Sequence, residues 1–282
     1  MSFNKFSEFE EQEISLKYLN GESSVVLSKI YNVSYSTILR IIRRNNINVR
    51  TQPEAQRKYN CDYNFFEDIN TEEKAYWLGF IAADGCVNVR KNQSVLTISL
   101  QGKDENHLEK FKKNINSTHP IRKYKVNKYN VCSISISNKK LVNDLNKYGI
   151  IQNKSLILEF PIIKKEFLNH FLRGYIDGDG GFYPYKKFNK KRNNYYNEYE
   201  FSVTSSKNFL EDFQKILIEN CSLNETKLKK AGNAFTLRYS GHNQVDRIFN
   251  FIYSNCLVYL DRKYIKYIAS FADHQSPLIY NV

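Results

Sequence analysis

Two aspartates, Asp84 and Asp179, stand at the same place in two copies of one short segment. The copies, AYWLGFIAADG at residues 75–85 and HFLRGYIDGDG at residues 170–180, align without gaps. If the two acids meet, their charges repel, and one carboxyl group stays protonated unless a cation lies between them. Hard divalent cations such as Mg²⁺ take oxygen ligands, and beside a phosphodiester they stabilise the attacking and leaving oxygens. The pair therefore indicates metal-dependent phosphodiester chemistry.

Small residues at matched positions indicate how the acids are brought together. Both segments are typical of apolar helices, and Gly79 and Ala83 in the first fall where Gly174 and Gly178 fall in the second. Small residues about one turn apart let two helix backbones approach closely. We therefore expect the two helices to pack side by side and to bring both acids to one end. The simpler interpretation, that each Asp only ends a helix before a turn, suits one copy but not a repeated one.

The elements that follow each copy also repeat, which indicates an internal duplication. Alternating apolar and polar residues predict strands, and longer amphipathic stretches predict helices, in the order αββαββα for each half. The predicted pairs are strands at 96–101 and 199–204, helices at 104–111 and 206–213, strands at 121–126 with 131–137 and at 226–230 with 234–240, and closing helices at 139–147 and 242–253. The predicted fold class is α+β, with two pseudo-symmetric αββαββα repeats of antiparallel sheet and helix.

The predicted strands have one apolar and one polar face. Ile134 and Ile136 alternate with serines, and Phe235 and Leu237 alternate with Thr and Arg. An antiparallel sheet packs one face on its helices, and an open face of hydroxyls and cations can meet base edges and phosphates in a DNA groove. An ordinary solvated face is the alternative, but it explains less well why basic residues crowd the strand ends. The expected DNA contacts in the sheets are Arg122, Lys123, Lys125, Lys186, Lys187, Lys190, Lys191, Arg192 and Arg238.

The first 59 residues predict a separate helical unit. Ser7 and Glu10 fit a capping box at the start of a helix that runs to about Leu19. A second helix over about 23–31, burying Val26, Leu27 and Ile30, and a third over about 35–45, burying Ile38, Ile41 and Ile42, are separated by a tight turn. The outward face of the third helix carries Arg40, Arg43 and Arg44, so the unit resembles a helix-turn-helix DNA reader. A three-helix protein-interaction module is the alternative.

The overall composition favours a polyanionic partner. The 282 residues include 42 Lys and Arg against 29 Asp and Glu, which gives a net charge of +13 and a pI near 9.3. No apolar run approaches the roughly 18–20 residues of a membrane-spanning helix, and the polar start is unlike a signal peptide. Five scattered cysteines and five scattered histidines disfavour a disulfide framework or a zinc site. We expect a reducing, intracellular setting, cytoplasmic or associated with the nucleoid.

The segments LGFIAADG and RGYIDGDG resemble the two motifs of LAGLIDADG homing endonucleases in their single-chain form, and the resemblance extends from about Thr71 to the C-terminus. It implies a monomeric, saddle-shaped enzyme that makes double-strand cuts at a long DNA target and leaves short 3′ overhangs. It also implies that Asp84 and Asp179 bind the essential metal, Mg²⁺ or another hard divalent cation, with ligands added by the backbone carbonyls of Ala83 and Gly178. Ala82 departs from the pattern where the second copy has Asp177, an acid that is not a metal ligand in the family.

The same resemblance implies basic and polar residues near the scissile phosphates. Lys154 and Lys263 follow the last helix of each half and are candidates to stabilise the transition state, although each could be a solvated charge. Gln101, with Thr204 or Ser205 in the second half, ends a matching strand and is a candidate to position water. The expected boundaries are a helix-turn-helix domain at 1–59, a linker at 60–73, and the two repeats at 74–160 and 161–282.

Two other functions fit the same scaffold. An RNA-splicing maturase or a DNA-binding transcription regulator could carry paired motifs of this kind with a helix-turn-helix. Loss of a motif acid would favour a protein that only binds, and both acids are present here. Cleavage of double-stranded DNA is therefore the favoured hypothesis.

Overall fold

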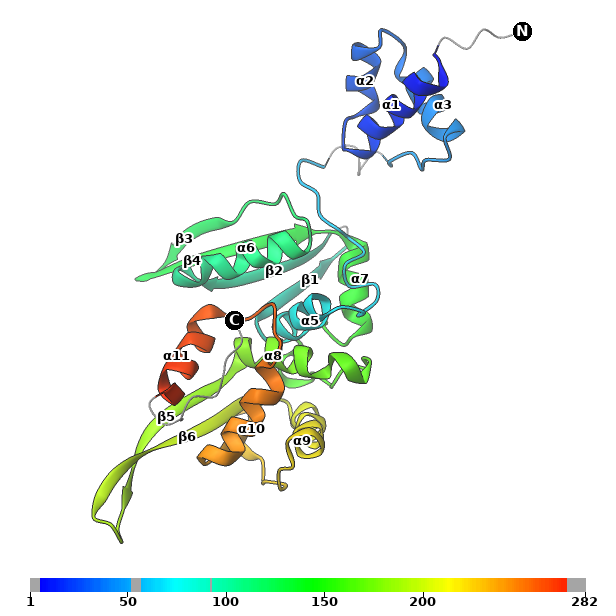
Figure 1. The fold of residues 1–282 in the computed structure, drawn as a ribbon. Helices are drawn as coiled ribbons and strands as arrows, with labels where there is room; N and C mark the ends of the chain where they lie inside the picture. Colours follow the sequence, from blue (N-terminus) through cyan, green and yellow to red (C-terminus); the bar gives the residue numbers. More distant parts are fainter. Residues whose placement is uncertain (1–5, 52–56, 92, 273–282) are drawn as a thin grey trace. The chain divides into compact units, whose positions relative to one another are not determined.

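The computed structural model describes residues 6–51, 57–91 and 93–272, with side chains to residue 269. The chain divides into two compact units, Met1–Tyr59 and Asn60–Val282 (Figure 1). Among the described residues, none of the helices has both the length and the apolar character needed to cross a membrane.

In the described part of the first unit there are three short helices: α1 (Glu8–Leu19), α2 (Ser24–Ile30) and α3 (Tyr35–Arg44). A serine precedes each helix, and its side chain accepts a hydrogen bond from the backbone N–H three residues on. The predicted capping box is confirmed, because the Ser7 N–H also donates to Glu10 Oε2 at 2.8 Å. Asn32, at φ 49°, forms the tight turn between α2 and α3, since Asn tolerates this left-handed conformation better than most residues.

The core of the first unit follows the prediction for α3 and departs from it for α2. Ile38, Ile41 and Ile42 are buried, but Val26 and Ile30 remain 47% and 55% exposed, so the prediction that both are buried is wrong. The seven-residue α2 buries only Leu27, because so short a helix can turn only a narrow strip toward its neighbours.

Two antiparallel sheets of four strands form the framework of the second unit, with orders β1-β2-β4-β3 and β5-β6-β8-β7. The strands are β1 (Gly85–Arg90), β2 (Gln93–Gln101), β3 (Arg122–Val126), β4 (Tyr129–Ser137), β5 (Gly180–Asn189), β6 (Asn194–Ser205), β7 (Lys229–Ala231) and β8 (Ala234–Ser240). The helices are α5 (Glu72–Asp84), α6 (Glu105–Asn114), α7 (Lys139–Lys147), α8 (Leu168–Asp179), α9 (Lys207–Cys221), α10 (His242–Tyr253) and α11 (Asp261–Ala272). The predicted α+β fold and the repeated αββαββα order are confirmed, and α11 adds a helix to the second half.

The expectation of a linker at residues 60–73 is wrong, because this segment packs on the second unit. Phe65, Phe66 and Ile69 are buried in its core. The Asp62 N–H donates to the Ile115 carbonyl at 2.8 Å, which ties the segment to the end of α6. Three large apolar side chains within the five residues 65–69 are the physical reason, since exposing each would cost about 1.5–3 kcal/mol.

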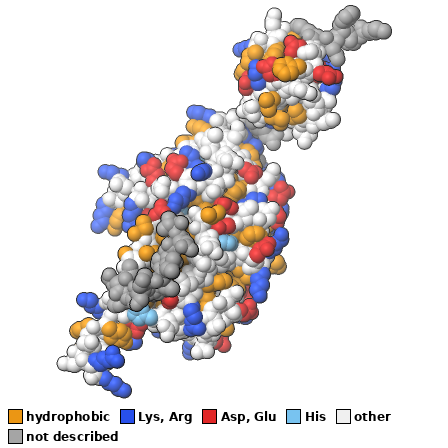
Figure 2. Space-filling view, viewed as in Figure 1, with side chains coloured by type: hydrophobic (Ala, Val, Ile, Leu, Met, Phe, Trp, Pro, Cys, Tyr) orange, Lys and Arg blue, Asp and Glu red, His pale blue; other side chains and the backbone are white. Residues whose placement is uncertain are grey.

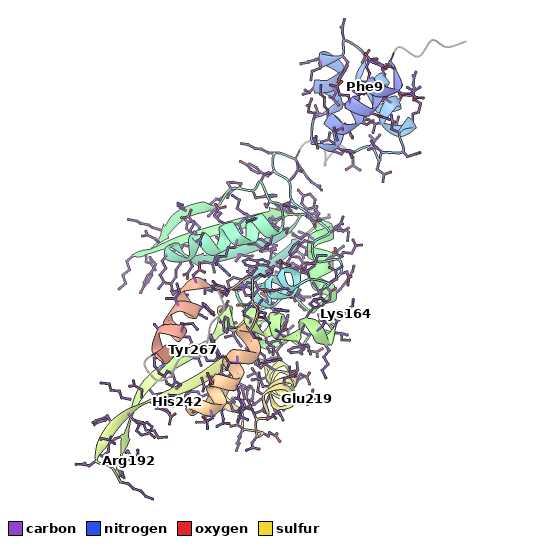
Figure 3. The ribbon with its side chains drawn as sticks, viewed as in Figure 1. Phe9, Lys164, Arg192, Glu219, His242 and Tyr267 are labelled. Atoms are coloured by element: carbon purple, nitrogen blue, oxygen red, sulfur yellow. The ribbon has the colours of Figure 1, made fainter. Side chains whose placement is uncertain are left out.

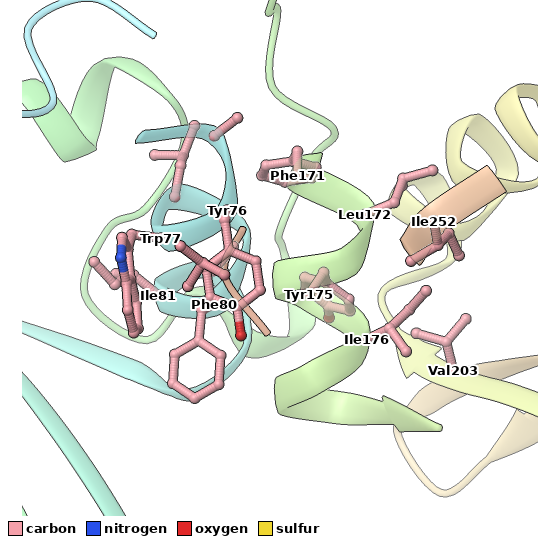
Figure 4. Packing of buried hydrophobic residues seen from close by; sticks show 14 of the residues in the cluster. Tyr76, Trp77, Phe80, Ile81, Phe171, Leu172, Tyr175, Ile176, Val203 and Ile252 are labelled. Carbon is pink, nitrogen blue, oxygen red and sulfur yellow. The ribbon is translucent and has the colours of Figure 1, made fainter. Parts of the chain in front are cut away.

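Helices α5 and α8 pack directly on each other at the centre of the second unit (Figure 4). A Cβ atom on Gly79 would lie 2.0 Å from the Phe171 carbonyl oxygen, and one on Gly174 would lie 1.9 Å from the Tyr76 carbonyl oxygen. The two backbones therefore touch at the glycines, as the spacing of small residues predicts. Trp77 is buried beside this contact and belongs to the core, with its indole N–H donating to Asn114 Oδ1 at 2.8 Å.

Candidate metal and DNA-binding site

The two motif acids end the paired helices α5 and α8, and each is followed at once by the first strand of its sheet. The structure brings them together. A Cβ atom placed on Gly178 would lie 3.4 Å from Asp84 Oδ2, so the carboxyl group of the first motif lies against the residue that precedes Asp179. Both side chains reach solvent at this end of the helix pair. The two acids can lie this close because the helix backbones touch at Gly79 and Gly174, earlier in α5 and α8.

The environment of the acids disfavours their ionised forms. Loss of water around the carboxyl group, followed by the charge of Asp179, raises the pKa of Asp84 from 3.8 to about 6. Loss of water also raises the pKa of Asp179. The charges of Lys154 and Lys263 act in the opposite direction on both acids and offset part of the effect. Two crowded carboxylates of this kind are stabilised by a cation placed between or beside them.

The raised pKa of Asp84 makes the stability of the folded protein depend on pH. Because the pKa of Asp84 is raised in the folded state, the native chain holds its proton more tightly than the unfolded chain, and stability falls as the pH rises from about 4 to about 6. At pH 8 without divalent metal, we expect the Asp84→Asn variant to have a higher melting temperature than the wild type. The increase should be about 2–4 °C for each kcal/mol by which the substitution stabilises the folded state. The difference should shrink as the pH falls through 6 and vanish near 4. Thermal melts across pH 4–8 measure it, and a wild type that is the more stable at pH 8 would contradict this account.

The oxygen groups at this site suit Mg²⁺. Within the described ranges, no group of three or more His, Cys, Asp or Glu residues is arranged to hold a metal ion. Mg²⁺ does not need such a cage, because it is usually bound by one or two carboxylates together with waters and substrate phosphates. Asp84 and Asp179 supply that donor set. Of the two expected carbonyl ligands, that of Gly178 already accepts a hydrogen bond from Lys263 Nζ at 3.0 Å.

Lys154 and Lys263 occupy equivalent positions beside the acids. Lys154 lies in a 3-10 turn (Lys154–Leu156) and donates to the Gly85 carbonyl at 2.5 Å, whereas Lys263, in the first turn of α11, donates to the Gly180 carbonyl at 2.6 Å. These glycines directly follow the two motif acids. Burial lowers the pKa of each ammonium group, and the nearby aspartates oppose that effect. The structure thus places both predicted lysines at the site.

Lys263 is more fully engaged than Lys154. It also donates to the carbonyls of Ile176 and Gly178 at 3.0 Å, so each of its three N–H groups has a partner at the end of α8. A cation at a helix C-terminus is favoured by the helix dipole. The ammonium group therefore holds the end of the helix that presents Asp179.

Sequence reasoning missed the residues that fix Lys263. Arg262 donates to both carboxylate oxygens of Asp104, with Nε–Oδ1 and Nη2–Oδ2 distances of 3.0 Å, and Asp261 pairs with Lys110 at 2.6 Å. These contacts fasten the start of α11 to the first half of the unit. The run Asp-Arg-Lys at 261–263 was visible in the sequence, but nothing in it indicated partners more than 150 residues away.

Asp177 is the buried acid that the family resemblance leaves outside the metal site. Its carboxylate accepts hydrogen bonds from the hydroxyls of Tyr76 at 2.7 Å and Tyr253 at 2.6 Å, and from the Leu260 N–H at 2.8 Å. With three donors it is satisfied inside the core. It joins α5, α10 and the start of α11, so its role here is to hold elements together rather than to bind a cation.

The register of the sheets decides among the water-positioning candidates. Gly85 pairs with Ile98 and Gly180 with Val203, so Ser99 matches Thr204, and Gln101 matches Ser206. The hydroxyls of Thr204 and Thr236 are hydrogen-bonded at 3.1 Å, and Gln101 is exposed at the end of β2.

Ser205 does not fit a water-positioning role. It is buried, and its hydroxyl accepts from the Tyr175 hydroxyl at 2.8 Å, so the prediction for this residue is wrong. Strand alternation turns it toward the helices. Ser99, exposed on β2, takes its place as a candidate. The sequence alignment missed it because pairing residues 96–101 with 199–204 is two residues out of the register that the two sheets adopt.

The open face of the first sheet carries a polar groove of about 460 Å³. It runs along β1 and β2 and is lined by Cys86, Asn88, Arg90, Gln93, Val95, Thr97 and Ser99. Hydroxyl, amide and guanidinium groups of this kind can meet base edges in the major groove. On the second sheet, Arg238 lies on the same open face as Ser202 and pairs with Glu200 at 3.5 Å.

Alternation along β3 separates the predicted basic contacts. Arg122 pairs with Ser133 on the open face. Lys123 and Lys125 point to the helix side, and Lys123 forms an ion pair with Glu105 at 2.7 Å. Arg122 therefore lies on the open face and the two lysines on the other, because neighbouring residues of a strand point to opposite faces.

In the first unit, Arg40 and Arg43 are exposed on α3. Arg44 instead forms an ion pair with the buried Glu11 of α1, with an Nε–Oε2 distance of 3.0 Å. All three arginines are therefore on the surface, and Arg44 differs from the other two in its ion pair with Glu11.

Comparison with known proteins gives one family match and several structures of similar fold. Residues 77–162 match the LAGLIDADG endonuclease family. A search of curated proteins found no match. The crystal structure of meganuclease I-SmaMI bound to uncleavable DNA with a TTGT central four is similar in fold, with a TM-score of 0.51 and 14% identity over 73% of this chain and 89% of that one.

The I-SmaMI complex with a TTCT central four gives a TM-score of 0.50 and 15% identity over 71% of this chain and 91% of that one. At such identities the likeness concerns the fold. The family model matches the part of the chain that contains the first motif, and the two solved structures are similar to this chain in fold.

Proposed function

We propose that this protein is a site-specific homing endonuclease that makes metal-dependent double-strand cuts in a long DNA target. The meeting of Asp84 and Asp179 at the end of the paired helices carries the proposal, because the site stabilises neither carboxylate well without a cation. The net charge of +13 and the polar open faces of the sheets supply a surface for DNA. Two repeats in one chain supply both halves of the site, so the proposed enzyme acts as a monomer.

The residues at the site have three different proposed roles: metal binding, charge stabilisation and the orientation of water. Asp84 and Asp179 would hold Mg²⁺, which when bound supplies charge stabilisation for the attacking and leaving oxygens. Lys154 and Lys263 hold the turns that follow the motif acids and keep positive charge beside the reacting phosphates. Two polar side chains at the strand ends, those of the exposed Gln101 and the half-buried Thr204, would orient water.

The first unit would add affinity rather than chemistry. Arg40 and Arg43 are exposed on α3, the helix that a helix-turn-helix places in the major groove. Each phosphate contact that such a unit adds should steepen the dependence of binding on salt by about 0.9 on a log–log plot.

One experiment tests the proposal directly. The protein is incubated with Mg²⁺ and a library of long DNA duplexes, and the ends produced are sequenced. Recurrent paired ends at one sequence, absent when EDTA replaces Mg²⁺, are the expected result. Tight binding of a single duplex without any cutting would favour a DNA-binding regulator, and binding restricted to structured RNA would favour a maturase.

The lysines allow a sharper test of the site. We expect Lys263→Ala to lower the cutting rate about 100-fold, in line with the loss of a single preorganised charge-stabilising group, while DNA affinity changes much less. Lys154→Ala should act in the same direction. Single-turnover rates at saturating DNA separate rate from affinity. A variant that only weakens binding would show that its lysine clamps a phosphate and takes no part in the cutting step.

A further inference from the structure

The first turn of α11 is bound to the first repeat, although α11 belongs to the second repeat. Arg262 donates to the carboxylate of Asp104 from Nε and from Nη2, at 3.0 Å in each case. Asp261 accepts hydrogen bonds from Lys110 at 2.6 Å and from Asn106 at 3.2 Å. Asn106 and Lys110 lie on α6, and Asp104 directly precedes that helix. The start of α6 in one repeat therefore holds the start of α11 in the other (Figure 1).

Asp104 forms this ion pair in place of a contact within its own helix. It is the N-cap residue of α6, a position from which an aspartate usually accepts a hydrogen bond from the first N–H groups of the helix. The Asp104 side chain makes no such bond; it is 5% exposed and binds Arg262 instead. A guanidinium group meets a carboxylate through two parallel N–H bonds, which fixes the orientation of both groups. The pair is therefore suited to hold Arg262 in one place.

The other lysine of the site has a different link to the opposite repeat. Ser206, the N-cap residue of α9, caps its own helix and also donates to the carbonyl of Leu158. Leu158 lies four residues after Lys154, and its link to Ser206 is one hydrogen bond between uncharged groups. Arg262 is the direct neighbour of Lys263, and its link is a bidentate ion pair. The position of Lys263 thus depends on the opposite repeat more directly than that of Lys154 does.

Lys263 lies between two anchors of α11. On one side is the turn that Asp104 holds. On the other side Tyr267, which Figure 3 labels, stacks on Phe249 of α10 with the ring centroids 3.8 Å apart. Because the lysine stem is flexible, the place of its ammonium group follows the place of the first turn. Movement of that turn would withdraw the ammonium group from the three carbonyls that it binds at the end of α8.

We propose that Asp104 is a positioning residue for DNA cutting: through Arg262 it keeps the ammonium group of Lys263 beside the two motif acids. The inference rests on the proposed function. The repeats are pseudo-symmetric and each brings one lysine to the site, so each lysine serves one of the two DNA strands. Loss of the Asp104 ion pair therefore slows the cut that Lys263 assists and spares the cut that Lys154 assists.

A general brace between the repeats is the alternative role for Asp104. Such a brace would support both lysines equally, and it would act whether or not Lys263 is present. Asp104→Asn separates the two roles, because it keeps the size of the side chain and removes its charge.

The affinity of this variant for DNA should change little. Asp104 is buried, and its charge is small beside the net charge of +13. Figure 2 shows Lys and Arg side chains spread over the visible face of the protein. The basic residues of the β5–β6 hairpin are all exposed: Lys186, Lys187, Lys190, Lys191 and Arg192. A change in the cutting rate can therefore be told apart from a change in binding.

A double-mutant cycle tests the link to Lys263. Asp104→Asn is introduced into the wild type, into Lys263→Ala and into Lys154→Ala, and single-turnover rates are measured at saturating DNA with the duplex cut in the library experiment. We expect Asp104→Asn to slow the wild type about 10-fold, less than removal of Lys263, since a displaced ammonium group still adds positive charge. It should slow Lys154→Ala by the same factor and Lys263→Ala not at all. Equal slowing in all three backgrounds, or none in the wild type, would overturn the inference.

The two strands give a second readout that a brace would not produce. A duplex with a different dye on each strand reports the two nicks separately. Lys263→Ala identifies the strand that Lys263 serves, and Asp104→Asn should slow the same strand while the other changes less than about twofold. Equal slowing of both strands by Asp104→Asn would show a brace and overturn the inference.

Two further variants make this test specific. Glu105→Gln removes a carboxylate charge at the next residue, whose ion pair with Lys123 at 2.7 Å stays within the first repeat. We expect it to cut both strands at the wild-type rate, and slowing like that of Asp104→Asn would contradict the proposal. Arg262→Lys replaces Asp104→Asn if that variant does not fold, because it keeps the charge but loses the two-pronged contact. It should slow the same strand as Lys263→Ala.

Hydrogen exchange without DNA separates this inference from the proposed function. The Lys263 N–H donates to the Leu260 carbonyl at 3.0 Å, so exchange in residues 258–264 reports whether the first turn of α11 is held. We expect faster exchange there in Asp104→Asn and no change in Glu105→Gln. If the wild type cuts and Asp104→Asn alters neither exchange nor rate, the positioning role falls and the nuclease stands. If the wild type binds a duplex without cutting it and Asp104→Asn speeds exchange, the hold on Lys263 stands and the nuclease falls.

Discussion

We expect Asp84→Asn or Asp179→Asn to abolish cutting of the cognate duplex and to leave DNA binding largely intact. Each change keeps the shape of the side chain and removes the charge that would hold the metal. Because a bound divalent ion contributes several kcal/mol to stabilising a phosphoryl transition state, we expect the rate to fall at least about 1,000-fold. The affinity of each variant for DNA should stay the same or rise slightly, because one negative charge beside the phosphates is lost. Cutting of a plasmid that carries the target, resolved into nicked and linear products, measures the effect on both strands.

A matched control distinguishes the site from a general effect of charge. Asp212→Asn makes the same chemical change on the outer surface of α9, where the carboxylate pairs with Lys215. We expect this variant to cut at the wild-type rate. Full cutting by either motif variant would exclude the metal role of that aspartate, and equal loss in all three variants would exclude a site at the helix ends.

The second large effect concerns the contact between α5 and α8. Gly174→Ala places a methyl group 1.9 Å from the Tyr76 carbonyl oxygen, which is backbone and cannot turn aside. Overpacking of a tight core costs about 1–3 kcal/mol and sometimes more, so we expect a loss of about 3 kcal/mol or more. Urea unfolding followed by tryptophan fluorescence measures it, because Trp77 is the single tryptophan of the chain and lies in this core.

Gly181→Ala is the control for the glycine substitution itself. Its new methyl group would meet only the far end of the flexible Tyr183 side chain, at 3.0 Å from the hydroxyl oxygen. We expect a change of less than about 1 kcal/mol, as for other substitutions that the surroundings accommodate. If Gly174→Ala and Gly181→Ala lower the free energy of unfolding equally, the loss comes from backbone conformation and not from the contact between the helices.

A methyl swap at the lower end of the interface keeps the test informative if Gly174→Ala fails to fold. A Cβ atom on Gly178 would lie 2.3 Å from the Ala83 Cβ atom. Gly178→Ala should therefore destabilise the protein, and adding Ala83→Gly should restore its stability by moving the methyl group across the interface. The interaction between the two changes is the quantity a double-mutant cycle isolates. Additive losses would contradict direct packing at this point.

Local features of the fold were predictable because their causes lie within a few residues. Serines at the starts of helices and the alternation of Ile134 and Ile136 with serines act through neighbouring backbone and side chains. The pairing of α5 and α8 was also predictable, since two copies of one small-residue pattern have matching surfaces. Predictions that needed a three-dimensional neighbour were less secure. Val26 looks like a core residue on a helical wheel, yet α2 is too short to bury it.

By itself the sequence determined the duplication, the order of elements in each repeat and the two acids that the repeats carry to one place. Only the tertiary structure decided which side chains share a face, as with Lys123 and Ser205, because strand register sets the direction of every residue. It alone showed that Lys263 holds the end of α8 through three carbonyls. The physical reason is distance along the chain: a residue's chemical type is written in the sequence, but its partners, often more than 80 residues away, exist only after the chain has folded.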